Sequence, residues 1–192
     1  MPKLSARDIT ITAVFAALAV VAARLVIPGP VPFSLLPFVV MLAGGLLGAR
    51  LGALSIIVYT LLGLIGLPVF ASPPFGGPAY VLQPTFGFIL GFVASAYLIG
   101  TLLNNNKQSG VVRYFFSMLA GVVVYYVIGL PYIYIILNYY LNQNVSIAYI
   151  AAIGFTPFIL LDLVKAAAAA ALARAVYRRL SAYGIDNSPA GS

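Results

Sequence analysis

The chain has 192 residues, of which 63% are hydrophobic and only 7% charged, and its mean hydropathy is +1.09. Soluble domains are typically about one quarter charged, so this composition indicates an integral membrane protein. The chain has no cysteine, histidine or glutamate and only three acidic residues, Asp8, Asp162 and Asp186. Without cysteine and histidine the chain cannot form disulfides or Cys/His metal sites, and three carboxylates are few for acid–base catalysis. We therefore expect neither an enzyme nor a bound metal.

Apolar runs divide the chain into predicted transmembrane helices, each of which needs about 20 mostly apolar residues. The runs cover residues 8–27, 33–49, 51–67, 80–103, 111–130 and 156–177. They predict an all-α integral membrane protein with six transmembrane helices. We expect one membrane domain over residues 1–180 and a flexible cytoplasmic tail over residues 181–192.

The first run has some features of a cleaved signal peptide, because Lys3 and Arg7 precede an apolar stretch. The stretch is long for a signal, however, and Arg24 lies within it, so we expect a retained helix. The second and third runs are short and separated by a turn, which predicts a helical hairpin. The tyrosine-rich residues 131–150 are expected to lie in the outer membrane interface, where tyrosine is favoured.

The basic residues predict the topology of the chain. The loops at residues 28–32, 68–79 and 131–155 contain no lysine or arginine. Cytoplasmic loops carry an excess of basic residues, so both termini are predicted to be cytoplasmic. The protein is predicted to lie in the cell membrane, and its basic residues are explained by this topology rather than by binding to nucleic acid. The basic residues on that predicted inner side are Lys3, Arg7, Arg50, Lys107, Arg113, Arg174, Arg178 and Arg179.

Arg24 and Lys165 do not fit this pattern, and together with Asp162 they lie within apolar runs. Asp162 and Lys165 are three residues apart, so on a helix they share one face. Ionisable residues inside membrane segments are usually functional. Because Tyr80, Gln83 and Thr85 begin the fourth run at a similar depth, we predict a pocket that opens outward and is lined by Tyr and Phe.

The charges of this predicted pocket suggest its ligand. Arg24, Lys165 and Asp162 sum to +1, which favours a solute with one carboxylate, while Asp162 accepts hydrogen bonds from N–H groups. A simpler alternative stays open, in which Asp162 and Lys165 only neutralise each other and Arg24 extends to the outer head groups.

Two further features concern partners. Ala13 with Ala17, and Ala19 with Ala23, are spaced by four residues, which favours close helix contacts either inside the chain or with another membrane protein. The sequence lacks a GxxxxGK[ST] phosphate loop. A binding subunit that another protein energises is therefore the favoured function.

Several segments carry a resemblance to a known family. They are "LAGGLLGARLGALSIIVYTLLGLIGLPVF", "QPTFGFILGFVASAYLIG", "GLP" and "FTPFILLDLVKAAAAAALA". In this order, over about residues 31–177, they resemble the BioY family of biotin transporters, the substrate-binding S components of energy-coupling factor (ECF) transporters.

The resemblance implies a six-helix S-component fold that takes up biotin from the outer side as a transported ligand, with no cofactor. It also implies a membrane coupling protein and two ATPase subunits as partners. Asp162 then faces the ureido ring of biotin and Lys165 its carboxylate. The alanines of the first helix, Ala13, Ala17, Ala19 and Ala23, resemble the face that S components present to the coupling protein.

One stretch departs from the family pattern. The fourth helix of the family usually begins G-P-T-G-G-Y, whereas residues 83–88 read Q-P-T-F-G-F. An S component for another vitamin or for a biotin precursor therefore stays open. A membrane scaffold without transport activity and an ion-coupled carrier are further alternatives. No arginine occurs in this helix, and Arg24 is proposed as the residue that binds the carboxylate instead.

Overall fold

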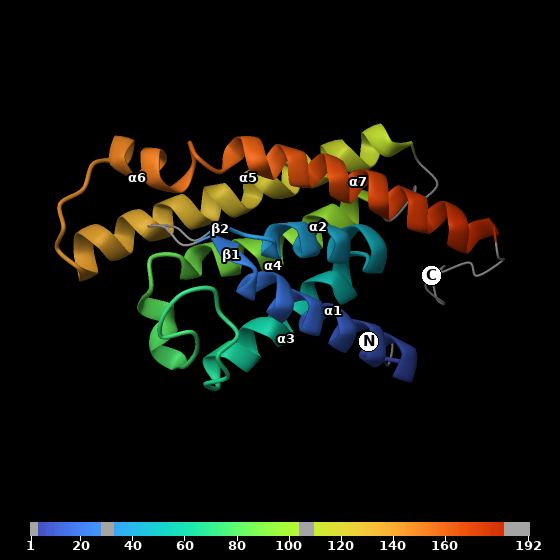
Figure 1. The fold of residues 1–192 in the computed structure, drawn as a ribbon, viewed down its shortest axis with the longest axis horizontal. Helices are drawn as coiled ribbons and strands as arrows, with labels where there is room; N and C mark the ends of the chain where they lie inside the picture. Colours follow the sequence, from blue (N-terminus) through green and yellow to red (C-terminus); the bar gives the residue numbers. More distant parts are fainter. Residues whose placement is uncertain (1–3, 28–32, 104–109, 183–192) are drawn as a thin grey trace.

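Helices make up most of the protein, as the sequence predicts. The structure, a computed structural model, describes residues 4–27, 33–103 and 110–182, and its long helices run lengthwise through the molecule (Figure 1). In chain order the elements are α1 (Ala6–Arg24), β1 (Val26–Ile27), β2 (Phe33–Ser34), α2 (Leu36–Leu47), α3 (Ala49–Leu64), the 3-10 helix η1 (Pro78–Leu82), α4 (Phe86–Leu103), α5 (Val111–Ile135), the π-helix η2 (Ile136–Tyr140), α6 (Ile147–Gly154) and α7 (Ile159–Ala182).

Some predicted features fall outside this description. Lys3, Lys107 and the predicted loop 28–32 lie outside the described residues, as does the predicted tail from residue 183 onward. The first two residues of that tail, 181 and 182, belong to α7.

The first helix is bounded by clear local signals. At its start Ser5 and Asp8 form a capping box, in which the backbone N–H of Asp8 donates to the Ser5 hydroxyl at 3.1 Å and that of Ser5 donates to the Asp8 carboxylate at 3.0 Å. At its end the chain enters β1, which pairs antiparallel with β2 through Val26↔Ser34 and Ile27↔Phe33. This ladder brings Phe33 and Ser34 back beside the end of α1.

The predicted hairpin of the second and third helices is confirmed. Gly48 alone separates α2 from α3, with a φ of 83° that glycine adopts without steric cost. Gly100 of α4 lies against this turn, and a β-carbon there would collide with the backbone of Gly48 and Ala49. A glycine at position 100 therefore allows α4 to approach the hairpin closely.

The fourth helix begins later than the predicted run. Residues 78–82 form η1, and α4 starts at Phe86 rather than at residue 80. Gln83 has a ψ of 136°, the extended conformation expected for the residue before a proline, here Pro84. The proline thus separates η1 from α4.

The fifth helix continues past its predicted end at residue 130. It extends through Pro131 to Ile135, and η2 prolongs it to Tyr140. Proline removes one helical hydrogen bond, here to the carbonyl of Val127 four residues earlier, but transmembrane helices tolerate such a loss. Residues 131–150, which are expected in the outer interface, thus contain the end of α5, η2 and the beginning of α6.

The described helices support three or four membrane spans by length and composition, fewer than the six predicted. Among the described residues, three helical units are long and apolar enough to cross a bilayer, namely α1, α4 and the continuous Val111–Tyr140. α6 and α7 together provide a fourth, bent by 44°. With 12 and 16 residues, α2 and α3 measure about 18 and 24 Å, less than the roughly 30 Å of hydrocarbon in a bilayer.

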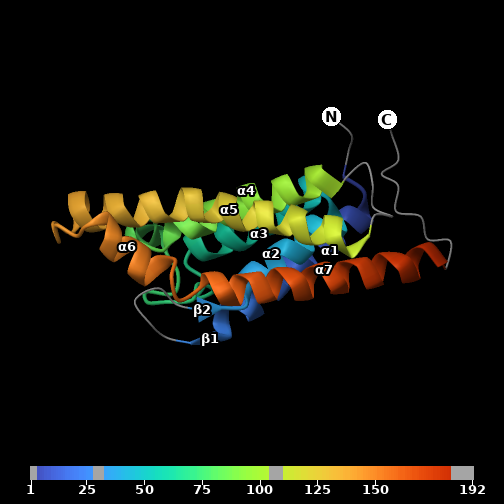
Figure 2. The same ribbon diagram turned by 90° about the horizontal axis from the view of Figure 1, so that it is seen from above.

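Glycines also bring α4 and α5 together, and the two helices lie side by side (Figures 1 and 2). A β-carbon at Gly91 of α4 would lie 2.7 Å from the Cα of Tyr125 on α5. Small residues at such positions permit close packing between helices in membranes. α7 packs in turn on α5 and α2.

The described arginines other than Arg24 gather at one end of the molecule. The start of α1, the α2–α3 turn, the end of α4, the start of α5 and the end of α7 all lie toward the right in Figure 1. Arg113, at the start of α5, donates to the backbone oxygen of Leu102 in α4 at 3.2 Å. The opposite end contains η1, η2 and α6.

Candidate binding site

A cavity lies where β2, α2, α4, α5 and the first turns of α7 meet. Its volume is about 80 Å³. Aromatic and aliphatic side chains form most of its wall, as in typical small-molecule sites. The polar side chains on its wall include Ser34, Thr85, Tyr126, Asp162 and Lys165.

Asp162 and Lys165 are joined in a buried ion pair on the first turns of α7. Lys165 Nζ lies 3.0 Å from Asp162 Oδ1, and the two residues are only 7% and 4% exposed. They meet because residues three apart on a helix face the same side. The carboxylate also lies near the positive end of the α7 dipole, which favours a negative charge there.

Each member of the pair has a second partner from another part of the chain. Asp162 Oδ2 accepts a hydrogen bond of 2.6 Å from the Tyr126 hydroxyl on α5. Lys165 Nζ lies over the ring of Phe33 in β2, 3.9 Å from its centroid, which is a cation–π contact. Phe33 in turn stacks on Phe158, with centroids 6.2 Å apart. The two charges are thus contacted by groups from two other segments, α5 and β2.

Tyr59 of α3 and Tyr80 of η1 form a further part of the cavity wall, and Phe70 of the connecting loop packs against both. The ring of Phe70 packs on that of Tyr80 with centroids 4.1 Å apart, and edge-on to that of Tyr59 at 5.7 Å. The hydroxyl of Tyr80 is hydrogen-bonded to that of Ser72 at 2.9 Å. These contacts hold the loop against the bundle, and the side chains of Tyr59 and Tyr80 face the cavity.

The structure brings together four of the six predicted pocket residues. Asp162, Lys165, Tyr80 and Thr85 line the cavity, whereas Arg24 and Gln83 are not among its lining residues.

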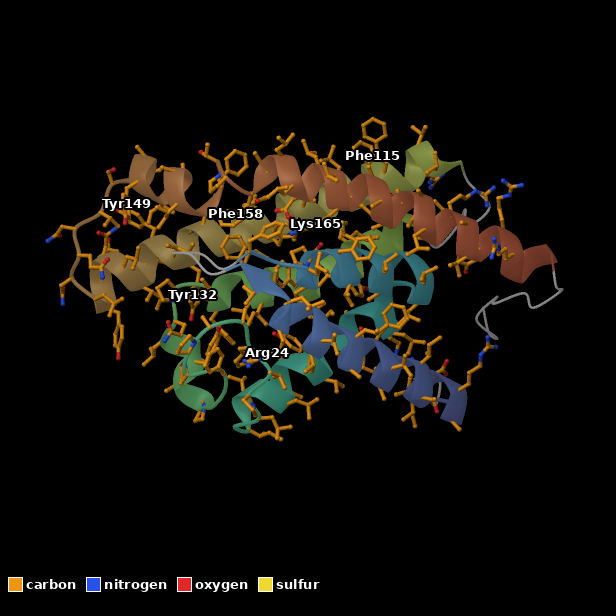
Figure 3. The ribbon with its side chains drawn as sticks, in the orientation of Figure 1. Arg24, Phe115, Tyr132, Tyr149, Phe158 and Lys165 are labelled. Atoms are coloured by element: carbon orange, nitrogen blue, oxygen red, sulfur yellow. The ribbon has the colours of Figure 1, made fainter. Side chains whose placement is uncertain are left out.

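Arg24 is engaged elsewhere, next to the loop that follows α3. Its guanidinium lies over the Phe75 ring at 4.7 Å, and its Nη1 donates to the backbone oxygen of Phe70 at 3.5 Å. Figure 3 shows Arg24 beside this loop and apart from Lys165 and Phe158. Among the described lining residues, the charged side chains are therefore those of Asp162 and Lys165, which cancel. The expected pocket charge of +1 is corrected to zero.

The four alanines of α1 do not form one surface. Ala19 and Ala23 are completely buried, whereas Ala13 and Ala17 are exposed. Positions 17 and 19 differ by about 200° around a helix of 3.6 residues per turn, so the two pairs point in nearly opposite directions. The expectation that all four contact a partner is corrected, since Ala19 and Ala23 pack inside this chain.

Three residues of the site have no distinguishing signal in the sequence. Tyr126 belongs to an uninterrupted apolar run beside another tyrosine, and Phe33 and Ser34 follow a proline-rich turn. Tyr126 and Asp162 are 36 positions apart. Only the packing of α5 on α7 brings them into contact.

Comparisons with known proteins agree over most of the chain. A model of the BioY family matches residues 1–182. The probable biotin transporter BioY of Lysinibacillus sphaericus is 39% identical over 179 residues, which cover 93% of this chain and 90% of that protein. The biotin transporter BioY of Thermotoga maritima is 40% identical over 168 residues, covering 87% and 94%.

A solved structure is similar as well. It is the crystal structure of the S-component for biotin from an ECF-type ABC transporter. It superposes with a TM-score of 0.78 at 26% sequence identity and covers 92% of this chain and 95% of that chain. The similarity therefore extends to the arrangement of helices around the cavity.

Proposed function

The chain belongs to the BioY family, and we propose that it is a membrane subunit that binds biotin and mediates its uptake together with an ECF energising module. It is a transporter component and not an enzyme. Biotin is its transported ligand rather than a cofactor. The observation that carries this proposal is the buried Asp162–Lys165 pair in the wall of a cavity that is mostly aromatic and aliphatic.

The cavity offers a complement to each part of biotin. Lys165 supplies a cation for the carboxylate, and Asp162 supplies an acceptor for the N–H groups of the ureido ring. Tyr59, Tyr80 and Phe88 provide apolar surface for the remainder of the molecule. Desolvation offsets most of the attraction within a buried ion pair, so stability alone is a weak reason to keep one.

The altered start of α4 has less influence on the cavity than the sequence suggests. Gln83 and Phe86, which replace small residues of the family pattern, are not among the described lining residues. Thr85, which matches the pattern, and Phe88, which replaces its tyrosine, do line the cavity. Phe86 is buried and packs against Tyr80 and Tyr132. Biotin is therefore favoured over a different vitamin or a biotin precursor.

In the membrane, the arginine-rich end faces the cytoplasm. In this proposal residues 1–180 are one domain with six spans. α1, α4, α5 with η2 and the bent α6–α7 unit are long enough to cross the bilayer, and the short helices α2 and α3 supply the other two spans. This arrangement follows the positive-inside rule. The η1 end then faces outward in the cytoplasmic membrane, and both termini are cytoplasmic.

A coupling protein and two ATPase subunits energise uptake. The chain contains no phosphate loop of its own. The face of α1 that contains Ala13 and Ala17 is exposed, and small residues there allow a partner helix to approach closely. We assign the contact with the coupling protein to this face.

Calorimetric titration of the detergent-purified chain with biotin tests the proposal. We expect the wild type to bind biotin, and Asp162→Asn and Lys165→Ala to weaken binding at least tenfold, since each removes a hydrogen bond to a charged group worth about 1.5–3 kcal/mol. Tyr114→Phe, in the buried part of α5 away from the cavity, is the matched control and should bind normally. Arg24→Ala tests whether Arg24 also contacts the carboxylate, and a tenfold loss would show that it does.

Other results would favour the alternatives. A wild type that ignores biotin but binds another compound from a vitamin panel is an S component for a different solute. A folded wild type that binds none of them supports a scaffold protein in which Asp162 and Lys165 are structural.

A further inference from the structure

The second oxygen of Asp162 is occupied by a residue outside the predicted site. Tyr126 donates to Oδ2 at 2.6 Å, whereas Lys165 approaches Oδ1 at 3.0 Å. A length of about 2.5–2.7 Å is typical of an O–H donor bound to a carboxylate, which is among the strong hydrogen bonds of proteins. The tyrosine is 6% exposed and the aspartate 4%, so water competes little for this contact.

The ring of Tyr126 is held in place independently of the carboxylate. It packs edge-on to Phe155 at 5.0 Å and to Phe88 at 5.9 Å, and it is tilted against Tyr125 at 4.9 Å. These neighbours belong to the α6–α7 connection, α4 and α5. Because three segments fix the ring, the position of its hydroxyl is determined before any ligand arrives.

Ligand binding changes the surroundings of Asp162. In the function proposed above, on which this inference rests, the ligand carboxylate competes with Asp162 for the ammonium of Lys165. When that ammonium turns toward the ligand, Asp162 loses its cation. The hydrogen bond from Tyr126 to Oδ2 then remains, and the Tyr125 side chain also lies close to the carboxylate.

We propose that Tyr126 is a positioning residue, whose hydroxyl holds Oδ2 of Asp162 so that Oδ1 faces the N–H groups of the ligand. An isolated carboxylate can rotate and loses affinity for a donor whenever it points away. A carboxylate anchored at one oxygen presents the other in a fixed direction, which lowers the entropy cost of binding. Tyr126 thus contributes, through Asp162, to recognition of the ligand's N–H groups and not of the ligand's carboxylate.

The test compares biotin with its methyl ester, which keeps the ureido N–H groups but lacks the carboxylate charge. We expect Tyr126→Phe to weaken the binding of both ligands by a similar factor, about ten- to a hundredfold, the loss typical of a hydrogen bond to a charged group. Lys165→Ala should weaken the binding of biotin much more than that of the ester. Tyr114→Phe, the same substitution elsewhere on α5, should change neither.

Two non-natural residues separate hydrogen bonding from folding. At position 126, 4-aminophenylalanine keeps a donor, whereas 4-fluorophenylalanine has a similar shape but none. The amino variant should bind biotin within a few-fold of the wild type, and the fluoro variant should resemble Tyr126→Phe. This comparison stays informative if Tyr126→Phe itself fails to fold.

A carboxyl signal provides a readout without ligand. The chain has only three acidic residues, all aspartates, so the nuclear magnetic resonance spectrum of protein labelled with carbon-13 at the aspartate carboxyls contains few resonances. The resonance that disappears in Asp162→Asn is that of Asp162. The fluoro variant should shift this resonance in the ligand-free protein, and Tyr114→Phe should not.

The outcomes are distinct. If the wild type binds biotin and the fluoro variant binds both ligands as tightly as the wild type does, Tyr126 has no positioning role, although the proposed function stands. If the fluoro variant loses biotin but not the ester, Tyr126 acts on the carboxylate end and the assignment is overturned. A wild type that does not bind biotin overturns the proposed function and this inference together.

Discussion

Neutralising both members of the buried ion pair should disturb the fold less than neutralising one. Lys165→Met leaves the Asp162 carboxylate, which is 4% exposed, without its cation. Asp162→Asn leaves the Lys165 ammonium with the Phe33 ring but no carboxylate. The double variant contains an amide and a thioether at these positions and no buried charge.

The magnitudes follow from the cost of an uncompensated ion. Breaking a buried pair by removing one partner typically lowers the free energy of unfolding by about 3–5 kcal/mol, whereas replacing both ions often changes it little. Tyr126 still donates to Asp162 in Lys165→Met, and the cavity admits some water, so we expect the lower end, about 3 kcal/mol, for each single variant. The double variant should lie within about 2 kcal/mol of the wild type.

Denaturant unfolding of the detergent-solubilised protein, followed by loss of helical circular dichroism, measures these differences. Calorimetric titration with biotin on the same preparations shows whether the pair also serves binding. We expect all three variants to lose most of their affinity, including the double variant whose stability recovers. Stability and affinity should therefore separate in the double variant alone.

Two results would refute this expectation. If the double variant is destabilised by the sum of the two single effects, the ion pair does not couple the two residues and desolvation is not the controlling cost. If the double variant is stable and still binds biotin, the charges do not recognise the ligand, and the role proposed for Asp162 and Lys165 is wrong.

Three further substitutions test the packing and the cavity. Gly100→Ala should destabilise the protein by about 1–3 kcal/mol, because its methyl group would strike the turn between α2 and α3; the melting temperature measures this, and Gly110→Ala, whose β-carbon meets no atom within 4 Å, is the control. Ala19→Leu should destabilise the isolated chain by a similar amount, since position 19 is completely buried, whereas Ala13→Leu should leave its melting temperature and biotin affinity unchanged but reduce co-purification with the coupling protein. Phe33→Leu removes the cation–π contact with the cavity lysine, worth about 0.5–2 kcal/mol, so the melting temperature should fall measurably, and an unchanged value would show that the contact contributes no stability.

Membrane character, helix content and the pairing of acid and base follow directly from the sequence. Apolar runs identify helices because a helix in lipid must satisfy its own backbone hydrogen bonds. The hairpin of α2 and α3 could be predicted because a short polar break separates two short runs. Asp162 and Lys165 could be paired because a spacing of three residues places them on one helix face whatever the rest of the fold does.

Helix boundaries beside proline were less predictable. Pro131 is a breaker by local rules, yet α5 continues through it, whereas Pro84 does separate η1 from α4. The difference lies in the surroundings of each proline, since a transmembrane helix can tolerate one missing hydrogen bond when packing preserves its direction.

What only the tertiary structure decided is which way each helix faces. In α1 the residues are apolar almost all round, so periodicity does not mark a buried side, and the sequence could not tell that Ala19 is buried while Ala13 is exposed. The same uncertainty hid the contact of Tyr126 with Asp162 and the position of Arg24 outside the cavity. Local spacing determined which residues lie together on one helix, but contacts between helices depend on the rotation of each helix within the bundle, which is set by side-chain packing across the whole chain.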